Sequence, residues 1–137
     1  MIKILTYGTF DLLHYGHLNL LKRCANLGDE LYVGVSTDEF AKQKGKCTVY
    51  NTEKRIEMIS DLKYVTLAFP EYSMTQKIED CKKYNIDIFV LGDDYKDTFK
   101  QMPEYNILLE LGVKVIFLER TPNISTTKLK ENLKNEK

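Results

Sequence analysis

The sequence predicts a doubly wound α/β fold, with a five-stranded, mostly parallel sheet and helices on both of its faces. Short β-prone runs alternate with segments of helical periodicity along the chain, which is the order that βαβ units produce. No hairpin dipeptide such as Asn-Gly lies between the strands, so we expect right-handed crossovers to connect them. The length of 137 residues and the hydrophobic content of 43% suit a single domain, residues 1–137, with one core.

Five strands are expected, at residues 2–7, 31–36, 64–69, 88–91 and 113–118. Each is a short run rich in apolar, β-branched or aromatic side chains, and the second is of the type that is buried on both faces. Gly8 follows the first run and Gly92 the fourth, where a glycine favours the turn into a loop. Ligands of such sheets bind at the carboxyl ends of the strands, so the loops after the first, second, fourth and fifth strands should line one site.

Five helices are expected, at residues 16–27, 53–62, 75–84 and 103–111 and from Ser125 onward. In the second, Ile56, Ile59 and Leu62 recur at i, i+3 and i+6 and so face the core together. Pro103 suits the first turn of the fourth helix, because a backbone N–H has no partner there in any case. The hydroxyl of Ser125 can cap the free N–H groups at the start of the last helix.

The charge and cysteine content argue against several classes of protein. Twenty Lys and Arg residues balance twenty Asp and Glu residues, so the molecule as a whole has no positive field that would draw it to nucleic acid. Cys24, Cys47 and Cys81 are odd in number and far apart, which argues against a disulfide framework or a zinc cluster. No apolar run is long enough for a signal peptide or a membrane span, so we expect a cytoplasmic protein without membrane insertion.

The loop after the first strand carries two histidines, His14 and His17, with Gly16 between them at the start of a helix. A helix N-terminus offers free N–H groups and a positive dipole end, and Gly16 lets a phosphate approach the backbone. The loop therefore indicates an anion site, the alternative being that both histidines are simply exposed at a helix start. It has neither the P-loop pattern nor the G-x-G-x-x-G of dinucleotide-binding proteins, which argues against hydride transfer.

Two separated motifs resemble one enzyme family. The H-x-G-H pattern at 14–17 is similar to that of the HxGH nucleotidyltransferase superfamily. Residues 120–127, Arg-Thr-Pro-Asn-Ile-Ser-Thr-Thr, would alone indicate a helix cap, but together with the first motif they resemble the R-T-x-G-I-S-T-T of the cytidylyltransferase family. The resemblance is closest to the glycerol-3-phosphate cytidylyltransferases and spans residues 1–130. It implies a Rossmann-like fold and a single cytidylyltransferase catalytic domain.

The resemblance implies that CMP is transferred from CTP to glycerol 3-phosphate, giving CDP-glycerol and pyrophosphate. It also implies Mg²⁺ as cofactor, a homodimer, and a product that feeds teichoic-acid or capsule-like polymers. Three alternatives stay open. They are a cytidylyltransferase for phosphocholine or phosphoethanolamine, an adenylyltransferase of the same superfamily, and a non-catalytic nucleotide sensor.

The resemblance and the chemistry of the residues together assign the site. The residues expected to be catalytic are His14, His17, Lys46 and Arg120. Those expected to bind the nucleotide are Gly8, Thr9, Phe10, His14, Gly16, His17, Lys46, Asp94, Arg120, Thr121, Ile124, Ser125, Thr126 and Thr127. Those expected to bind the acceptor are Lys44, Lys77, Arg55, Lys63 and Met74. No protein ligand to a metal is assigned, because Mg²⁺ on a nucleotide is held mainly by phosphate and water.

Side-chain chemistry supports several of these assignments independently. Lys42, Lys44 and Lys46 alternate after the second strand, so in extended backbone they would share one face near the phosphates, the alternative being a solvated basic loop. Arg55, at the start of the second helix, could reach the same anions or be an exposed helix arginine. Asp94 follows the fourth strand and could contact the nucleotide, occupy a turn or belong to a metal-binding pair.

Three positions depart from the family pattern. Asn123 stands in place of a glycine, but asparagine tolerates the left-handed conformation better than most residues. Met74 replaces a tryptophan and Lys63 an arginine near the acceptor, so a stacking plane and a bidentate fork are lost. These two positions motivate the alternative acceptors. The segment 96–105 is longer than in the family.

Overall fold

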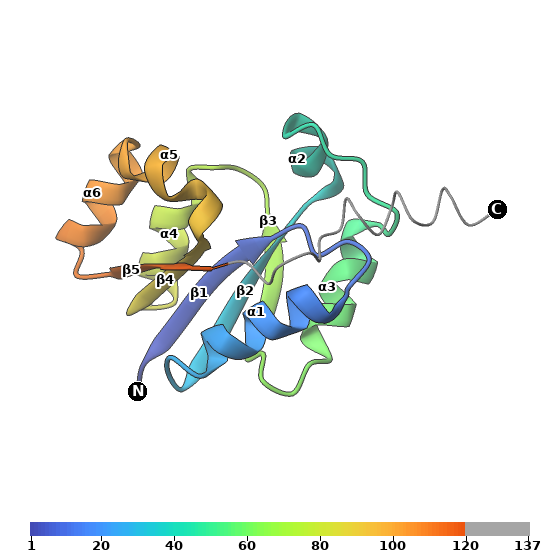
Figure 1. Ribbon diagram of the computed structural model, residues 1–137, viewed down its shortest axis with the longest axis horizontal. Coiled ribbons are helices and arrows are strands. Elements are labelled where there is room, and N and C mark those ends of the chain that lie inside the picture. The colour runs from blue at the N-terminus through green and yellow to red at the C-terminus, as the bar shows by residue number, and fades with distance from the viewer. Residues whose placement is uncertain (120–137) are drawn as a thin grey trace.

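The computed structural model describes residues 1–119, which contain a five-stranded sheet in the order β3-β2-β1-β4-β5 (Figure 1). The strands are β1 (Lys3–Gly8), β2 (Glu30–Ser36), β3 (Leu67–Glu71), β4 (Ile88–Gly92) and β5 (Lys114–Leu118). Every neighbouring pair is parallel, as the lack of hairpin signals predicts. The winding direction reverses between β1 and β4, which confirms the doubly wound α/β fold.

Helices cover both faces of the sheet (Figure 1). On one face lie α1 (Tyr15–Ala25) and α3 (Thr52–Ser60). On the other lie α4 (Gln76–Lys83), α5 (Lys96–Lys100) and α6 (Pro103–Glu110). The short helix α2 (Asp38–Gln43) and a turn of 3₁₀ helix, η1 (Asp93–Tyr95), follow closely on β2 and β4. These two short elements therefore lie at the carboxyl ends of the strands.

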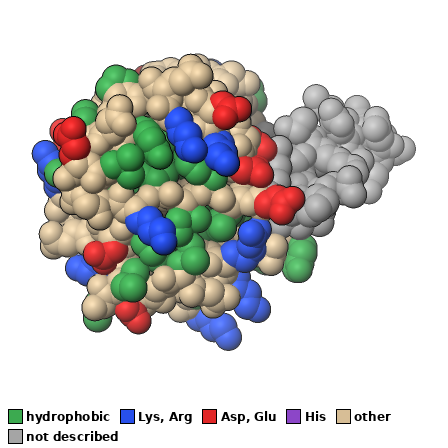
Figure 2. All heavy atoms as spheres, turned by 60° about the vertical axis from the view of Figure 1, so that its left-hand side comes forward, with side chains coloured by type: hydrophobic (Ala, Val, Ile, Leu, Met, Phe, Trp, Pro, Cys, Tyr) green, Lys and Arg blue, Asp and Glu red, His purple; other side chains and the backbone are tan. Residues whose placement is uncertain are grey.

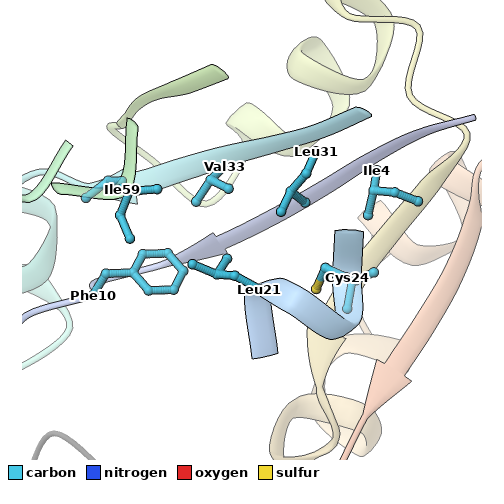
Figure 3. Packing of buried hydrophobic residues seen from close by; sticks show 9 residues of the cluster. Ile4, Phe10, Leu21, Cys24, Leu31, Val33 and Ile59 are labelled. Atoms are coloured by element: carbon cyan, nitrogen blue, oxygen red, sulfur yellow. The ribbon is translucent and has the colours of Figure 1, made fainter. Parts of the chain in front are cut away.

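Each face has its own apolar core, because successive strand residues point to opposite sides of a sheet. Ile4 of β1 belongs to the cluster that packs against α1 and α3, whereas its neighbour Leu5 belongs to the cluster against α4, α5 and α6. Figure 3 shows the first cluster, in which Leu21 and Cys24 of α1 lie against the strands. Ile59, the centre of the predicted apolar stripe of α3, joins the same cluster and confirms that stripe.

Three short elements, α2, η1 and α5, were not expected from the sequence. Helix α2 forms because the Oγ1 of Thr37 accepts a hydrogen bond from the Phe40 N–H at 3.0 Å and so caps the helix. Lys42 consequently lies within a helix and Lys44 at its end, and Gly45 follows with a φ of 79°. The predicted extended backbone of the lysine run is therefore wrong.

The long segment 96–105 forms α5 and the start of α6. Phe99 of α5 is 3% exposed and packs edge-on against the rings of Phe89, Tyr105 and Phe117. Because Phe89 and Phe117 belong to β4 and β5, the segment covers that end of the sheet instead of forming a surface loop.

One strand is displaced along the chain relative to the prediction. The predicted strand 64–69 begins only at Leu67, because the carbonyl of Leu62 accepts from the Val65 N–H at 3.0 Å and closes a turn there. The strand ends at Glu71, which brings this acid to the carboxyl edge of the sheet.

The side of the molecule that carries α4, α5 and α6 has a mixed surface. Figure 2 shows apolar side chains on this side with Lys and Arg side chains between them. Ile107 and Leu109 of α6 are exposed apolar residues. No helix within residues 1–119 is both long and apolar enough to span a bilayer.

Candidate active site

The carboxyl ends of the strands meet around the point where the sheet reverses. β1 ends at Gly8 and β4 ends at Gly92, on either side of this point. Ser36 of β2 and Glu71 of β3 lie at the same edge and are partners in the strand register. Doubly wound sheets bind their ligands at this point, outside the carboxyl ends of the strands. The predicted site residues that follow β1, β2 and β4 are brought to this edge.

The two histidines of the loop after β1 stack on each other at the start of α1. Their ring centroids are 3.9 Å apart and their planes are 23° from parallel. His14 is the N-cap residue, and its Nδ1 accepts from the Gly16 N–H at 2.9 Å. In a neutral ring this leaves the proton on Nε2, which can then donate to a phosphate. The Nε2 of His14 and the Nδ1 of His17 are buried, so the alternative of two exposed histidines does not describe them.

Phe10 supports His17 from the core. Its ring is 4% exposed and stands edge-on to the His17 ring, with centroids 5.6 Å apart. Gly8 makes room for this ring, because a Cβ at Gly8 would lie 2.6 Å from the Phe10 Cζ. Phe10 has a φ of 52°, a left-handed conformation that costs a residue other than glycine about 1–3 kcal/mol. Because the ring lies in the core, the predicted contact of Phe10 with the nucleotide would be made by its backbone atoms.

A buried carboxylate joins the histidine loop to the loop that carries Lys46. Asp11 is 1% exposed, and its two oxygens accept from the N–H groups of Val49 at 2.7 Å and Tyr50 at 3.0 Å. Hydrogen bonds to an ionised oxygen are roughly twice as strong as neutral ones. Asp11 thus fixes this loop relative to the histidines, while the side chain of Lys46 itself is exposed.

Arg55 ties the loops after β1 and β2 to α3. Its side chain is fully buried, and its Nη1 donates to the carbonyls of Thr9 at 2.8 Å and Ser36 at 2.6 Å. Its Nε donates to the carbonyl of Tyr50 at 3.0 Å and its Nη2 to the carboxylate of Asp38 at 2.7 Å. The alternative of an exposed helix arginine is therefore wrong. The predicted contact with acceptor phosphate finds no support either, because these donors are directed at protein oxygens.

Asp38 is held in its ionised form. Burial alone would raise the pKa of its carboxyl group, but hydrogen bonds from Arg55, from the Thr52 N–H and from the Thr48 hydroxyl outweigh burial and leave this pKa lowered. The ion pair of Asp38 with Arg55 therefore forms over the whole neutral range.

Lys44 and Lys77, both predicted to bind the acceptor, reach the strand ends from the end of α2 and from α4. Lys44 Nζ donates to Ser36 Oγ at 2.9 Å, and Lys77 Nζ donates to the Met74 carbonyl at 2.9 Å. Desolvation lowers the pKa of both ammonium groups, and the carboxylate of Glu71 acts in the opposite direction. For Glu71 itself, burial raises the pKa and the two lysines oppose it. The structure thus places both lysines around one acid.

The other predicted residues differ in their distance from this edge. Asp94 is exposed on η1 after β4, and Met74 is 43% exposed before α4. Lys63 lies between α3 and the amino end of β3, so within one chain it is at the opposite edge of the sheet from Lys44 and Lys77. The predicted residues that lie outside the described part of the chain are Arg120, Thr121, Ile124, Ser125, Thr126 and Thr127.

Sequence reasoning did not identify the acids that organise the site. Asp11 and the partly exposed Asp38 lie outside the two motifs at 14–17 and 120–127, and nothing in the sequence near them indicates that they bind backbone N–H groups. Glu71 follows a proline at the end of an apolar run. The signal that could have identified Glu71 is its position, because an acid at the carboxyl end of a parallel strand lies at the ligand-binding edge of the sheet. Asp80 is a further acid that the sequence did not single out, and its Oδ2 accepts a hydrogen bond from the Tyr7 hydroxyl at 2.6 Å.

Known proteins are similar to this chain in sequence and in fold. A family model described as cytidylyltransferase-like matches residues 5–132. Glycerol-3-phosphate cytidylyltransferase of Bacillus spizizenii is 47% identical over 97% of this chain and 98% of its own length, and that of Staphylococcus aureus is 44% identical over 97% and 96%. The crystal structure of a lipopolysaccharide core biosynthesis protein from Thermoplasma volcanium aligns with a TM-score of 0.70 at 31% identity, over 88% of this chain and 97% of that one. Since both relatives match along almost their whole lengths, the chain belongs to the cytidylyltransferase-like family, among the glycerol-3-phosphate cytidylyltransferases.

Proposed function

We propose that this chain is an enzyme that transfers CMP from CTP to glycerol 3-phosphate, giving CDP-glycerol and pyrophosphate. The observation that carries the proposal is the stack of His14 and His17 at the start of α1, where the sheet reverses. The free N–H groups and the positive dipole end of a helix suit a triphosphate there. The names of the two bacterial relatives support the same reaction.

The chemistry is an in-line displacement at phosphorus. A phosphate oxygen of glycerol 3-phosphate attacks the α-phosphorus of CTP. One O–P bond forms, and the bond between the α-phosphorus and the bridging oxygen of pyrophosphate breaks. Because the attacking oxygen is already anionic near neutral pH, the reaction needs no general base. The work of the protein is to position the reactants and to stabilise the developing charge.

The described residues divide this work. His14 donates from Nε2 to a phosphate oxygen, because the Gly16 N–H fixes its Nδ1 as an acceptor. His17, stacked on His14, serves the same group of phosphates. Lys46, on the loop that Asp11 holds, supplies positive charge for the α-phosphate and the leaving pyrophosphate. A catalytic role for Arg120 stays a prediction.

Mg²⁺ is part of the proposal. Among residues 1–119, no group of three or more His, Cys, Asp and Glu side chains could hold a metal ion. The ion we propose binds through the phosphates of the nucleotide and through water, as Mg²⁺ commonly does. When bound, Mg²⁺ would neutralise part of the triphosphate charge. We assign it no protein ligand and no separate step.

The assembly and the place of the reaction are also proposals. β3 is an edge strand of the sheet, and Leu67 on it is 41% exposed, which suits pairing with a second copy in a homodimer. Sedimentation velocity would show one species of twice the chain mass. A cytoplasmic location would give the enzyme access to CTP, and CDP-glycerol would then feed teichoic-acid or capsule-like polymers.

The test is pyrophosphate release by the purified protein with Mg²⁺. CTP and ATP are each combined with glycerol 3-phosphate, phosphocholine and phosphoethanolamine. We expect turnover with CTP and glycerol 3-phosphate. Turnover with another acceptor would support the second candidate, which the exposed Met74 motivates because it offers no aromatic plane for stacking. CTP binding without pyrophosphate release would contradict an enzymatic function, and release with ATP alone would contradict the nucleotide assignment.

A further inference from the structure

A buried acid, Glu71, lies at the end of β3 beside the two lysines assigned to the acceptor. Its side chain is 3% exposed, and its Oε1 accepts from the Ser36 hydroxyl at 3.0 Å. Ser36 Oγ, which is completely buried, accepts in turn from Lys44 Nζ at 2.9 Å. Two hydrogen bonds in series therefore link the Lys44 ammonium to the Glu71 carboxylate.

Lys77 is coupled to the same acid by charge. It is 4% exposed, its Nζ donates to the Met74 carbonyl at 2.9 Å, and it lies 5.7 Å from the centroid of the Tyr7 ring. Desolvation favours the neutral form of this ammonium group and lowers its pKa, while the Glu71 carboxylate opposes that effect. An ammonium group buried to this extent stays charged only when an opposite charge or a hydrogen-bond acceptor stands near it.

We infer that Glu71 is a positioning residue that keeps Lys44 and Lys77 charged and in place for the phosphate of the acceptor. The inference rests on the proposed function, in which these two lysines bind that phosphate. Two neighbouring, partly desolvated ammonium groups repel each other, and each promotes loss of a proton from the other. Glu71 also repels the incoming phosphate. We therefore expect Glu71 to favour binding of the acceptor at alkaline pH, where its negative charge delays deprotonation of the lysines.

Other charged and titratable groups surround this cluster. Lys46 and Arg55 act on Lys44 and favour its neutral form, as Lys77 does. Asp80 acts on Glu71 and raises its pKa, after burial and the two lysines. Glu104 and Cys81 act on Lys77 in the same direction as Glu71. The carboxylate of Glu71 thus favours the charged form of both lysines.

The test is the pH dependence of the KM for glycerol 3-phosphate, at saturating CTP, in wild type and Glu71→Gln. The amide keeps an oxygen that can accept from Ser36 but removes the charge. We expect the alkaline rise in this KM to move toward lower pH by about one unit or more, which makes the KM about tenfold higher in that range. The KM for CTP should stay within about twofold. In protein labelled with ¹³C at the lysine Cε, the titrations of both lysines should move to lower pH in the same variant.

Two further variants separate charge from hydrogen bonding. Glu71→Asp keeps the charge, so the alkaline rise in its KM for glycerol 3-phosphate should stay at nearly the same pH as in wild type. Ser36→Ala removes the link to Lys44 without removing the charge, so the acceptor KM should rise at every pH without a shift of this alkaline rise. Glu79→Gln is the matched control, since Glu79 is exposed on the same helix as Lys77, and its profile should match wild type.

The outcomes separate this inference from the proposed function. If wild type turns over CTP and glycerol 3-phosphate but the Glu71→Gln profile coincides with it, the inference is overturned and the proposed function stands. If wild type shows no turnover, the proposed function fails. Lysine titrations that are the same in wild type and Glu71→Gln would then overturn the inference separately, because they are measured without turnover. If Glu71→Gln does not fold, the Ser36→Ala variant decides, because an acceptor KM equal to that of wild type would overturn the role of the linked cluster.

Discussion

Replacing Arg55 with methionine removes the buried side chain that joins three loops of the site. The guanidinium makes four hydrogen bonds, to Thr9, Ser36, Tyr50 and Asp38. A hydrogen bond that involves a charged group contributes about 1.5–3 kcal/mol, so the gross loss is large. The side chain of Asp38 is 48% exposed, however, and water can replace Arg55 there. We therefore expect the free energy of unfolding to fall by about 3–5 kcal/mol, a large share of the stability of a small domain.

Urea denaturation followed by circular dichroism measures this loss. Arg55→Lys is the matched control, because it keeps the positive charge but not the planar guanidinium group. We expect its free energy of unfolding to fall by about half as much as that of Arg55→Met. The loss in Arg55→Met should also shrink in acid. The lowered pKa of Asp38 means that its pairing stabilises the native state above the unfolded pKa, about 3.9, and ceases to do so as the pH falls through the folded pKa. A loss below about 1 kcal/mol at neutral pH would refute the structural role of Arg55.

Three other substitutions test the core and the histidine loop. His17→Ala should lower turnover by on the order of 10²–10³ with little change in the urea midpoint, whereas a structural histidine would lose stability more than rate. Gly8→Ala places a Cβ 2.6 Å from the Phe10 ring, so it should destabilise by about 1–3 kcal/mol and also lower kcat, and an unchanged midpoint would contradict the packing of Phe10 on Gly8. Leu21→Ala opens the core beneath α1 and should lower the free energy of unfolding by about 2–5 kcal/mol at unchanged KM values, both measurable on the same preparation.

The fold could be predicted because its signals are local and repeated. Apolar runs with helical segments between them specify parallel strands and crossovers, and the stripe through Ile59 specifies which face of α3 is buried. The short helix α2 escaped prediction because its signal is a single cap at Thr37, close to the alternating lysines, which were interpreted as an extended loop after the strand. The start of β3 was misplaced because a turn at Leu62 competes with an apolar run that continues through it.

The site could be predicted only as far as motifs carry chemistry of their own. The histidine pair could be predicted from the sequence, because the spacing of His14 and His17 places both at the start of one helix. The role of Arg55 is not, because its partners come from three loops that only the folded chain brings together. The same holds for Glu71, whose relation to Lys44 depends on the register of β2 with β3.

The central claim is that the enzyme makes CDP-glycerol, and ³¹P NMR of the reaction with CTP and glycerol 3-phosphate tests it most directly. We expect a diphosphate diester and free pyrophosphate to appear in equal amounts as both substrates disappear, and both signals to depend on His17. Formation of CMP or CDP while glycerol 3-phosphate stays unchanged would contradict the account, because CTP would then be hydrolysed and no CMP would be transferred.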